Sequence, residues 1–227
     1  MKLDEKWFEL YESLYGTTFN KILTIGTPNE GYENYPIKSL AQLRQMCEEN
    51  YPKKEFYISL YDYDSDELAI KWDPRDNTPY EKYSKKNCIL FRFIQNTDII
   101  KEETKELTDV QKFMFIRRTL NLGNNKEIFE DVRKVYDAIE ELFNIKSWVL
   151  FNGYNECYLY VFTESEMKLK NPTLTYYYFY KFIENYTGVK TLIYSQIEPF
   201  SQILSLPGSQ NNNTRLYTKP YNITLDY

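Results

Sequence analysis

The sequence predicts an α+β fold built on a mixed sheet of split βαβ order, with helices on one face of the sheet. Three observations predict it: short apolar strands between residues 55 and 93, a long helix with one apolar stripe, and a hairpin followed by a further helix and strand. In order, the core elements read βα-ββ-αβ, as in ferredoxin-like and RNA-recognition-like sheets. Such a sheet leaves its other face open for a ligand.

Residues 1–54 are expected to form N-terminal α/β elements that are mainly helical. Asp4 can cap a first helix that runs through Leu14, and Ser39 with Gln42 forms an S-x-x-Q capping box at the start of a second helix. The stretch between them, residues 22–37, contains two glycines and two prolines. It therefore predicts a loop with one short strand.

Two segments carry the clearest strand signals in the first half. Glu55–Asp64, EFYISLYDYD, is rich in β-branched and aromatic residues, and Asn87–Phe93, NCILFRF, has a similar composition. Ser65 and Asp66 are expected to turn the chain after the first of these segments. Leu68–Trp72 would then return beside it.

A long helix is the strongest signal in the second half. A shorter helix precedes it, capped by Thr108 and ending near Leu120, and the break Gly123–Asn125 separates the two. The apolar residues of the long helix recur at helical spacing and form one stripe over about five turns. They are Ile128, Val132, Val135, Ile139 and Leu142.

A hairpin, a helix and a last strand complete the predicted sheet. Ser147–Phe151 and Cys157–Phe162 flank the turn at Asn152-Gly153, Pro172 opens a helix through Tyr186, and Thr191–Tyr194 forms the last strand. We expect one domain over residues 1–227, with a core over 55–213 and a C-terminal tail over 214–227.

Composition narrows the possible chemistry. The chain has 227 residues, enough for one domain or two small ones, and no histidine. The absence of histidine excludes a Ser/His/Asp triad, a Cys/His dyad and an imidazole zinc site. The net charge of −5 argues against indiscriminate binding to phosphate backbones. The 23 tyrosines and 14 phenylalanines can pack a core or form faces on which bases stack.

The three cysteines, Cys47, Cys88 and Cys157, are far apart and form no CxxC pair. Neither a disulfide framework nor a cysteine metal site is expected, which fits a reducing compartment. The first residues are charged and amphipathic, and no stretch approaches the ~18 apolar residues of a membrane span. We expect a soluble cytoplasmic protein with no membrane partner.

Asp62 and Asp64 are two residues apart on a predicted strand, so their carboxylates should leave the same face. Paired carboxylates at a sheet edge suit Mg²⁺ or Mn²⁺, which prefer oxygen ligands. A solvated acidic turn explains the same residues. A calcium loop with Asp66 and Asp73 as further ligands is a third reading, but Glu67 stands where its sharp turn needs glycine.

Three segments occur in a recognisable order. The apolar strand ending at Asp62-Tyr63-Asp64 resembles an hhhDhD motif, and Phe151–Tyr160, FNGYNECYLY, resembles a hairpin of the form sGxxGxH. Ile203–Asn211, ILSLPGSQN, is similar to an RLIRLPGSLH segment. Their order over residues 55–213 resembles the archaeo-eukaryotic primase superfamily, which includes primase small subunits and plasmid or viral primase-polymerases.

The resemblance implies a primase-polymerase fold and a role in DNA replication. It implies transfer of a nucleotide from an NTP or dNTP to a primer or first nucleotide, supported by Mg²⁺ or Mn²⁺. Asp62 and Asp64 would be the catalytic metal ligands, with Glu198 as a third carboxylate, while Tyr158, Ser209 and Asn211 would lie near the triphosphate. The expected partners are a DNA template or single-stranded DNA, nucleoside triphosphates and other replication proteins.

Several positions depart from the family pattern. Tyr158 stands in the place of a nucleotide-binding histidine, and Glu198 is the only acid near the expected third ligand. Ser205 replaces an arginine whose charge Lys219, Arg215 or Arg117 could supply. Each loss could cost ~2 to 4 kcal/mol of transition-state stabilisation.

Three functions therefore stay open from the sequence. The first is a working metal-dependent nucleotidyltransferase. The second is a non-catalytic relative that binds single-stranded DNA, nucleotide or a replication partner. The third is an interaction domain whose motif matches are accidental.

Overall fold

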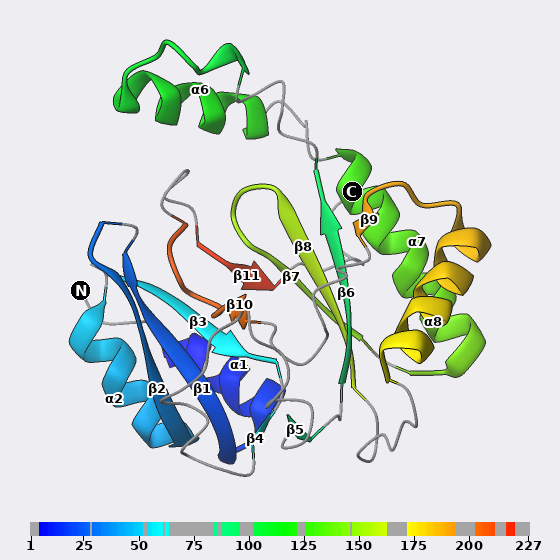
Figure 1. Ribbon diagram of the computed structural model, residues 1–227, viewed down its shortest axis with the longest axis horizontal. Coiled ribbons are helices and arrows are strands. Elements are labelled where there is room, and N and C mark those ends of the chain that lie inside the picture. The colour runs from blue at the N-terminus through cyan, green and yellow to red at the C-terminus, as the bar shows by residue number, and fades with distance from the viewer. Residues whose placement is uncertain are drawn as a thin grey trace. The chain divides into compact units, whose positions relative to one another are not determined.

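The computed structural model describes residues 5–27, 29–51, 54–60, 62–63, 84–85, 88–95, 102–121, 126–145, 147–162, 172–193, 203–211 and 217–220. Its helices and antiparallel sheets confirm the predicted α+β class (Figure 1). No helix in these ranges is both long and apolar enough to cross a membrane.

The chain divides into two compact units, each assembled from separate stretches of sequence. The first comprises Met1–Cys88, Thr163–Lys168 and Ser195–Gln210. The second comprises Ile89–Phe162, Leu169–Tyr194 and Asn211–Tyr227.

A four-stranded antiparallel sheet of order β10-β3-β1-β2 forms the first unit. Its strands are β1 (Thr18–Thr27), β2 (Gly31–Ser39), β3 (Glu55–Ser59) and β10 (Ile203–Ser205). Two helices pack on one face, α1 (Glu5–Tyr15) and α2 (Leu40–Asn50). The Ser39 hydroxyl accepts a hydrogen bond from the Gln42 N–H at 3.3 Å, which confirms the predicted cap of α2. A separate pair, β4 (Asp62–Tyr63) and β5 (Ser84–Lys85), completes the described strands of this unit.

The prediction of a loop at residues 22–37 is wrong, because β1 and β2 form a hairpin there. Pro36 pairs with Ile22 on a strand at the sheet edge, where a missing N–H need not break the ladder. A Cβ on Gly26 would come within 2.1 Å of the Gly31 carbonyl oxygen, so glycine is required for the strands to approach. The residues that suggested a loop are therefore compatible with an edge hairpin.

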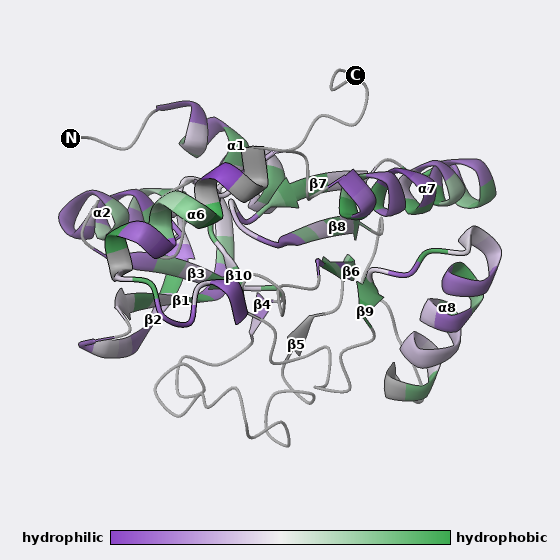
Figure 2. Ribbon diagram, turned by 90° about the horizontal axis from the view of Figure 1, so that it is seen from above, coloured by the Kyte–Doolittle hydropathy of each residue, from purple (hydrophilic) through white to green (hydrophobic). Residues whose placement is uncertain are grey.

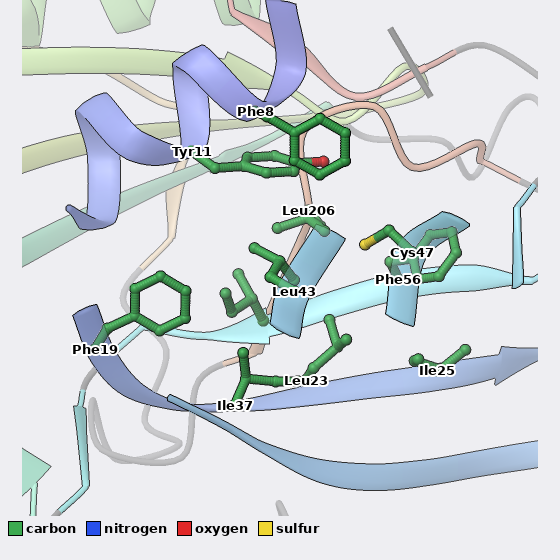
Figure 3. Packing of buried hydrophobic residues seen from close by; sticks show 11 residues of the cluster. Phe8, Tyr11, Phe19, Leu23, Ile25, Ile37, Leu43, Cys47, Phe56 and Leu206 are labelled. Atoms are coloured by element: carbon green, nitrogen blue, oxygen red, sulfur yellow. The ribbon is translucent and has the colours of Figure 1, made fainter. Parts of the chain in front are cut away.

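The core of the first unit lies between its helices and its sheet. Figure 3 shows Phe8 and Tyr11 of α1 on one side of this core and Leu23, Ile25 and Ile37 of the sheet on the other. All five side chains are buried, and the Phe8 and Tyr11 rings meet edge to face with centroids 5.5 Å apart. Burial of such side chains contributes roughly 2 kcal/mol each to folding, which accounts for the docking of α1.

A five-stranded sheet of order β11-β7-β8-β6-β9 forms the second unit. Its strands are β6 (Cys88–Ile94), β7 (Ser147–Phe151), β8 (Glu156–Phe162), β9 (Leu192–Ile193) and β11 (Lys219–Pro220). The helices are α6 (Asp109–Asn121), α7 (Lys126–Phe143) and α8 (Pro172–Thr187). The β7–β8 pairing confirms the predicted hairpin, and β6 lies between β8 and β9.

The long helix α7 has the predicted amphipathic pattern. Green hydrophobic and purple hydrophilic residues alternate along it in Figure 2. Its stripe is buried from Ile128 to Ile139, whereas Leu142 near its end remains partly exposed. The outer face carries ion pairs at helical spacing, including Lys126 with Glu130, as expected for a solvated face.

Candidate functional site

Asp62 does not continue the strand that precedes it. The sequence predicted one strand over Glu55–Asp64, but β3 ends at Ser59 and Asp62 belongs to β4, where it pairs with Lys85. The strand that carries the predicted motif lies in the four-stranded sheet of the first unit, between β1 and β10. Asp64 lies outside the described residues.

A buried lysine contacts the chain where β3 ends. Lys21 of β1 is only 5% exposed, and its Nζ donates to the Leu60 carbonyl at 2.9 Å and to the Ser59 carbonyl at 3.4 Å. The ammonium group thus donates to the last residue of β3 and to the residue that follows it. The Tyr15 ring lies 5.1 Å from the same ammonium group and adds a cation–π contact.

Asp62 completes the environment of this ammonium group. Its Oδ1 lies 3.4 Å from Lys21 Nζ and also accepts from the Asn20 N–H at 3.4 Å. Burial lowers the pKa of Lys21, and the Asp62 carboxylate opposes that shift. Three oxygens, two from carbonyls and one from a carboxylate, thus surround one internal cation. The Asp62 side chain is still 26% exposed.

The LPGS segment lies at the other end of β3. The Leu206 N–H donates to the Phe56 carbonyl at 2.9 Å, and the Phe56 N–H donates to the Ser209 hydroxyl at 3.0 Å. Ser209 is buried, and its hydroxyl continues the hydrogen bonding of β10 with β3 beyond Ser205. Phe56 is the second residue of β3 and Ser59 the last, so on the order of 10 Å of strand separates the contact with Ser209 from the end of β3 that precedes Asp62.

The Pro207-Gly208 bend is fixed by α1. The Tyr11 hydroxyl donates to the Pro207 carbonyl, and Gly208 has φ +84°, which favours glycine. A Cβ on Gly208 would lie 3.1 Å from the Trp7 ring. The structure thus gives LPGS contacts that position the bend within the fold.

A second cluster lies on the hairpin of the second unit. The Asn152 side chain accepts from three successive backbone N–H groups, those of Tyr154, Asn155 and Glu156, at 2.9, 3.1 and 3.0 Å. This bracing fixes the start of β8. From there Glu156 accepts from the Tyr158 hydroxyl and pairs with Arg92 of β6 at 2.5 Å.

Arg92, Glu156 and Tyr158 share the face of the second unit's sheet that lies opposite its helices. Phe151 packs against Phe129 of α7, with ring centroids 5.3 Å apart, and it pairs with Cys157, so both lie on the helix side. Alternation then places Glu156 and Tyr158 on the other face. On β6, Phe91 contacts Tyr180 of α8 at 5.0 Å, and the next residue, Arg92, points away from the helices.

Within this cluster the charges of Arg92 and Glu156 are paired, and one Arg92 donor is left over. Burial acts to lower the pKa of Arg92, but the charge of Glu156 and the nearby Tyr158 outweigh it, and the Arg92 pKa is raised. Within the described residues, the buried Arg92 Nε has no hydrogen-bond acceptor. Such a donor can serve a ligand that supplies the acceptor.

Aromatic side chains extend this face. Tyr160 pairs with Trp148 across the hairpin, and its ring stacks with that of Phe162 at 6.0 Å, almost parallel. Trp148 and Phe162 are half-buried, while Tyr158 and Tyr160 are buried. The same face therefore carries two accessible rings and the Arg92 guanidinium group.

Of the residues expected to bind metal, only Asp62 lies within the described part of the chain. Among the described residues, no group of three or more Asp, Glu or Cys side chains could hold an ion. Asp62 pairs with Lys21 and Glu156 with Arg92.

The remaining predicted residues lie apart or outside the described ranges. Lys219 is exposed on β11 opposite Phe151, and Asn211 is partly buried in the second unit. Glu198 and Arg215 lie outside the described residues, as does the Arg117 side chain.

Sequence reasoning missed Lys21, Arg92 and Glu156. Glu156 had a usable signal, because it precedes Tyr158 by two residues on a predicted strand and must share its face. Lys21 and Arg92 had none, since each meets its partner only through strand pairing between distant segments.

The fold is similar to that of known polymerase domains. The polymerase domain of Mycobacterium tuberculosis Ligase D in complex with DNA matches with a TM-score of 0.56 and 12% identity, covering 97% of this chain and 79% of that one. The AEP domain of the cyanophage S-2L primase-polymerase matches with a TM-score of 0.51 and 13% identity, covering 98% and 92%. No family model and no curated protein matches the sequence. The chain thus has the fold of primase-polymerase domains.

Proposed function

We propose that this chain is a primase-polymerase-like protein of DNA replication that binds single-stranded DNA without transferring nucleotides. Its binding surface would be the helix-free face of the second sheet, whose order β7-β8-β6-β9 we interpret as the split βαβ arrangement. The observation that carries the proposal is the ion pair between Arg92 and Glu156, with the Tyr158 hydroxyl on the same carboxylate. Metal binding is disfavoured at Asp62, the one predicted metal ligand among the described residues, because Lys21 Nζ already lies 3.4 Å from its Oδ1.

The same face suits unpaired bases. Trp148 and Phe162 present half-buried rings on which bases can stack, and such stacking is worth roughly 1 to 3 kcal/mol per base. The free Nε of Arg92 can donate to a phosphate or base oxygen. Because the chain carries a net charge of −5, binding would rely on this local site rather than on a broad basic surface.

Fluorescence anisotropy of a labelled single-stranded oligonucleotide tests the proposal. Trp148→Ala should weaken binding about tenfold or more, and Arg92→Gln should weaken it as well. Tyr136→Ala is the matched control, because Tyr136 is a half-buried aromatic residue on α7 of the same unit. Failure of the wild type to bind, or equal affinity in all four proteins, would contradict the proposal.

A second candidate is metal-dependent nucleotidyl transfer. The partial exposure of Asp62 favours it, because a carboxylate that remains accessible could still bind Mg²⁺ or Mn²⁺ if Lys21 moved away. Primer extension with either ion should then be seen in the wild type and lost in the double variant Asp62→Ala/Asp64→Ala. If the wild type binds DNA but extends no primer with either ion, the result supports the first candidate, binding without nucleotide transfer.

A further inference from the structure

The outer face of α8 carries an exposed aromatic row. Tyr178, Phe182 and Tyr186 recur every four residues and are 62%, 47% and 49% exposed, and Leu174 extends the row by one turn. Residues four apart lie on one side of a helix. We call Tyr178, Phe182 and Tyr186 the α8 aromatic face.

This face continues onto the end of α7. Phe143 contacts Phe179 of α8 with ring centroids 5.7 Å apart, and both Phe143 and Leu142 are exposed by about two fifths. Phe182 and Tyr186 stack with centroids 6.0 Å apart. The result is one contiguous apolar surface, of the kind that marks interaction sites when it is large.

The two helices of this layer differ in a way that requires explanation. The outer side of α7 carries ion pairs, as a solvated helix should, whereas the exposed side of α8 carries the aromatic rings of Tyr178, Phe182 and Tyr186. Large exposed apolar side chains that gather on one face mark interaction sites. The α8 aromatic face therefore calls for a partner.

Charge decides what kind of partner fits. The charged residues of α8 are Lys181 and Glu184, and they pair with each other at 2.5 Å, so the face has no net charge. A neutral apolar face offers nothing to the phosphates of DNA. It also lets two copies of a chain with a net charge of −5 approach without local repulsion.

We propose that the α8 aromatic face is the interface of a homodimer. Equivalent rows spaced four residues apart can interdigitate when two α8 helices cross around a two-fold axis. Tyr178, Phe182 and Tyr186 are about half exposed, and an aromatic side chain has roughly 200 Å² of surface. Together with Leu142 and Phe143, these residues could bury on the order of 1,000 Å² of surface, summed over the two copies. That area is at the low end of specific interfaces, so we expect micromolar dissociation.

Sedimentation velocity of the full chain over a range of concentrations tests the proposal. The wild type should shift from monomer to dimer in the micromolar range, and Tyr178→Glu/Phe182→Glu should remain monomeric. Val110→Glu is the control, because Val110 is 69% exposed on α6, outside the α8 aromatic face. It should dimerise like the wild type.

Two results would overturn the proposal. One is a wild type that stays monomeric throughout the range, and the other is a dimer that survives in the double variant. Should the glutamate variant fail to fold by circular dichroism, Tyr178→Ala/Phe182→Ala replaces it with the same expectation. If the variant stays dimeric but loses oligonucleotide binding, the face binds DNA and the dimer proposal falls. Neither result depends on whether the sheet face binds DNA.

Discussion

The Asp131 carboxylate on α7 binds Thr191 through two hydrogen bonds, one from its backbone N–H at 2.9 Å and one from its hydroxyl at 3.0 Å. The Lys190 N–H donates to the same oxygen at 2.8 Å. This carboxylate joins two segments about sixty residues apart, at the point where the chain enters β9. It is 3% exposed, and its role here is structural.

Asp131→Ala should destabilise the protein by about 3 kcal/mol, because it removes the acceptor of two buried Thr191 donors and of the Lys190 N–H. Urea unfolding at neutral pH measures the change. Asp137→Ala on the exposed side of α7 is the control and should cost well under 1 kcal/mol. Equal effects of the two substitutions would contradict the role assigned to Asp131.

The contribution of Asp131 should depend on pH. Burial alone would raise the pKa of Asp131, but the hydrogen bonds from Thr191 and Lys190 outweigh it and hold the pKa below its usual range. The folded-state pKa is thus below the unfolded value of about 4, so the stabilisation is present above that pH and is lost as the pH falls through the folded-state pKa. Urea midpoints of the wild type and Asp131→Asn should therefore converge on acidification. A constant difference would show that the charge is not responsible.

Lys21→Met should open the position that the ammonium group now occupies. The variant leaves the Ser59 and Leu60 carbonyls and Asp62 without their cation, which should cost about 2 kcal/mol. Mn²⁺ should then raise the melting temperature of the variant but not of the wild type. Lys38→Met, at an exposed position of β2, should respond like the wild type. Equal stabilisation of all three proteins by Mn²⁺ would show that Lys21 does not exclude the ion.

Gly208→Ala should destabilise the first unit more than Gly16→Ala does. Both glycines have a positive φ, +84° and +75°, so both variants carry similar backbone strain of about 1 kcal/mol. Only Gly208 would place its Cβ against Trp7, at 3.1 Å, whereas nothing lies within 4 Å of a Cβ on Gly16. Thermal unfolding of the two variants isolates the contact. A larger loss in Gly16→Ala would be evidence against docking of the LPGS bend on α1.

The elements with strong local signals were predictable from the sequence. The apolar stripe of α7, the cap at Ser39 and the hairpin around Asn152 depend on residues a few positions apart, and all three are confirmed. The β1–β2 hairpin was missed because proline and glycine signal a loop unless the strand is known to lie at an edge. Edge position is a property of the sheet, so local pattern cannot supply it.

The site was less predictable, because its contacts join distant segments. Nothing near Lys21 in the sequence indicates that its ammonium group meets Asp62, forty-one residues later. Likewise, Glu156 lies sixty-four positions after Arg92, and their pairing requires β6 to lie beside β8. The sequence shows which side chains are charged, but it does not show whether a partner of opposite charge already pairs with them.

The pairing of β10 with β3 bears on how the protein is made. Leu204 aligns with Ile58, so the sheet of the first unit gains this edge strand only after the long stretch of chain between the two strands has been synthesised. Until then β3 offers unpaired backbone groups that can recruit other nascent chains, and contacts this distant in sequence form slowly. Efficient production should thus depend on shielding β3 during translation, which makes this protein a candidate client of ribosome-associated chaperones.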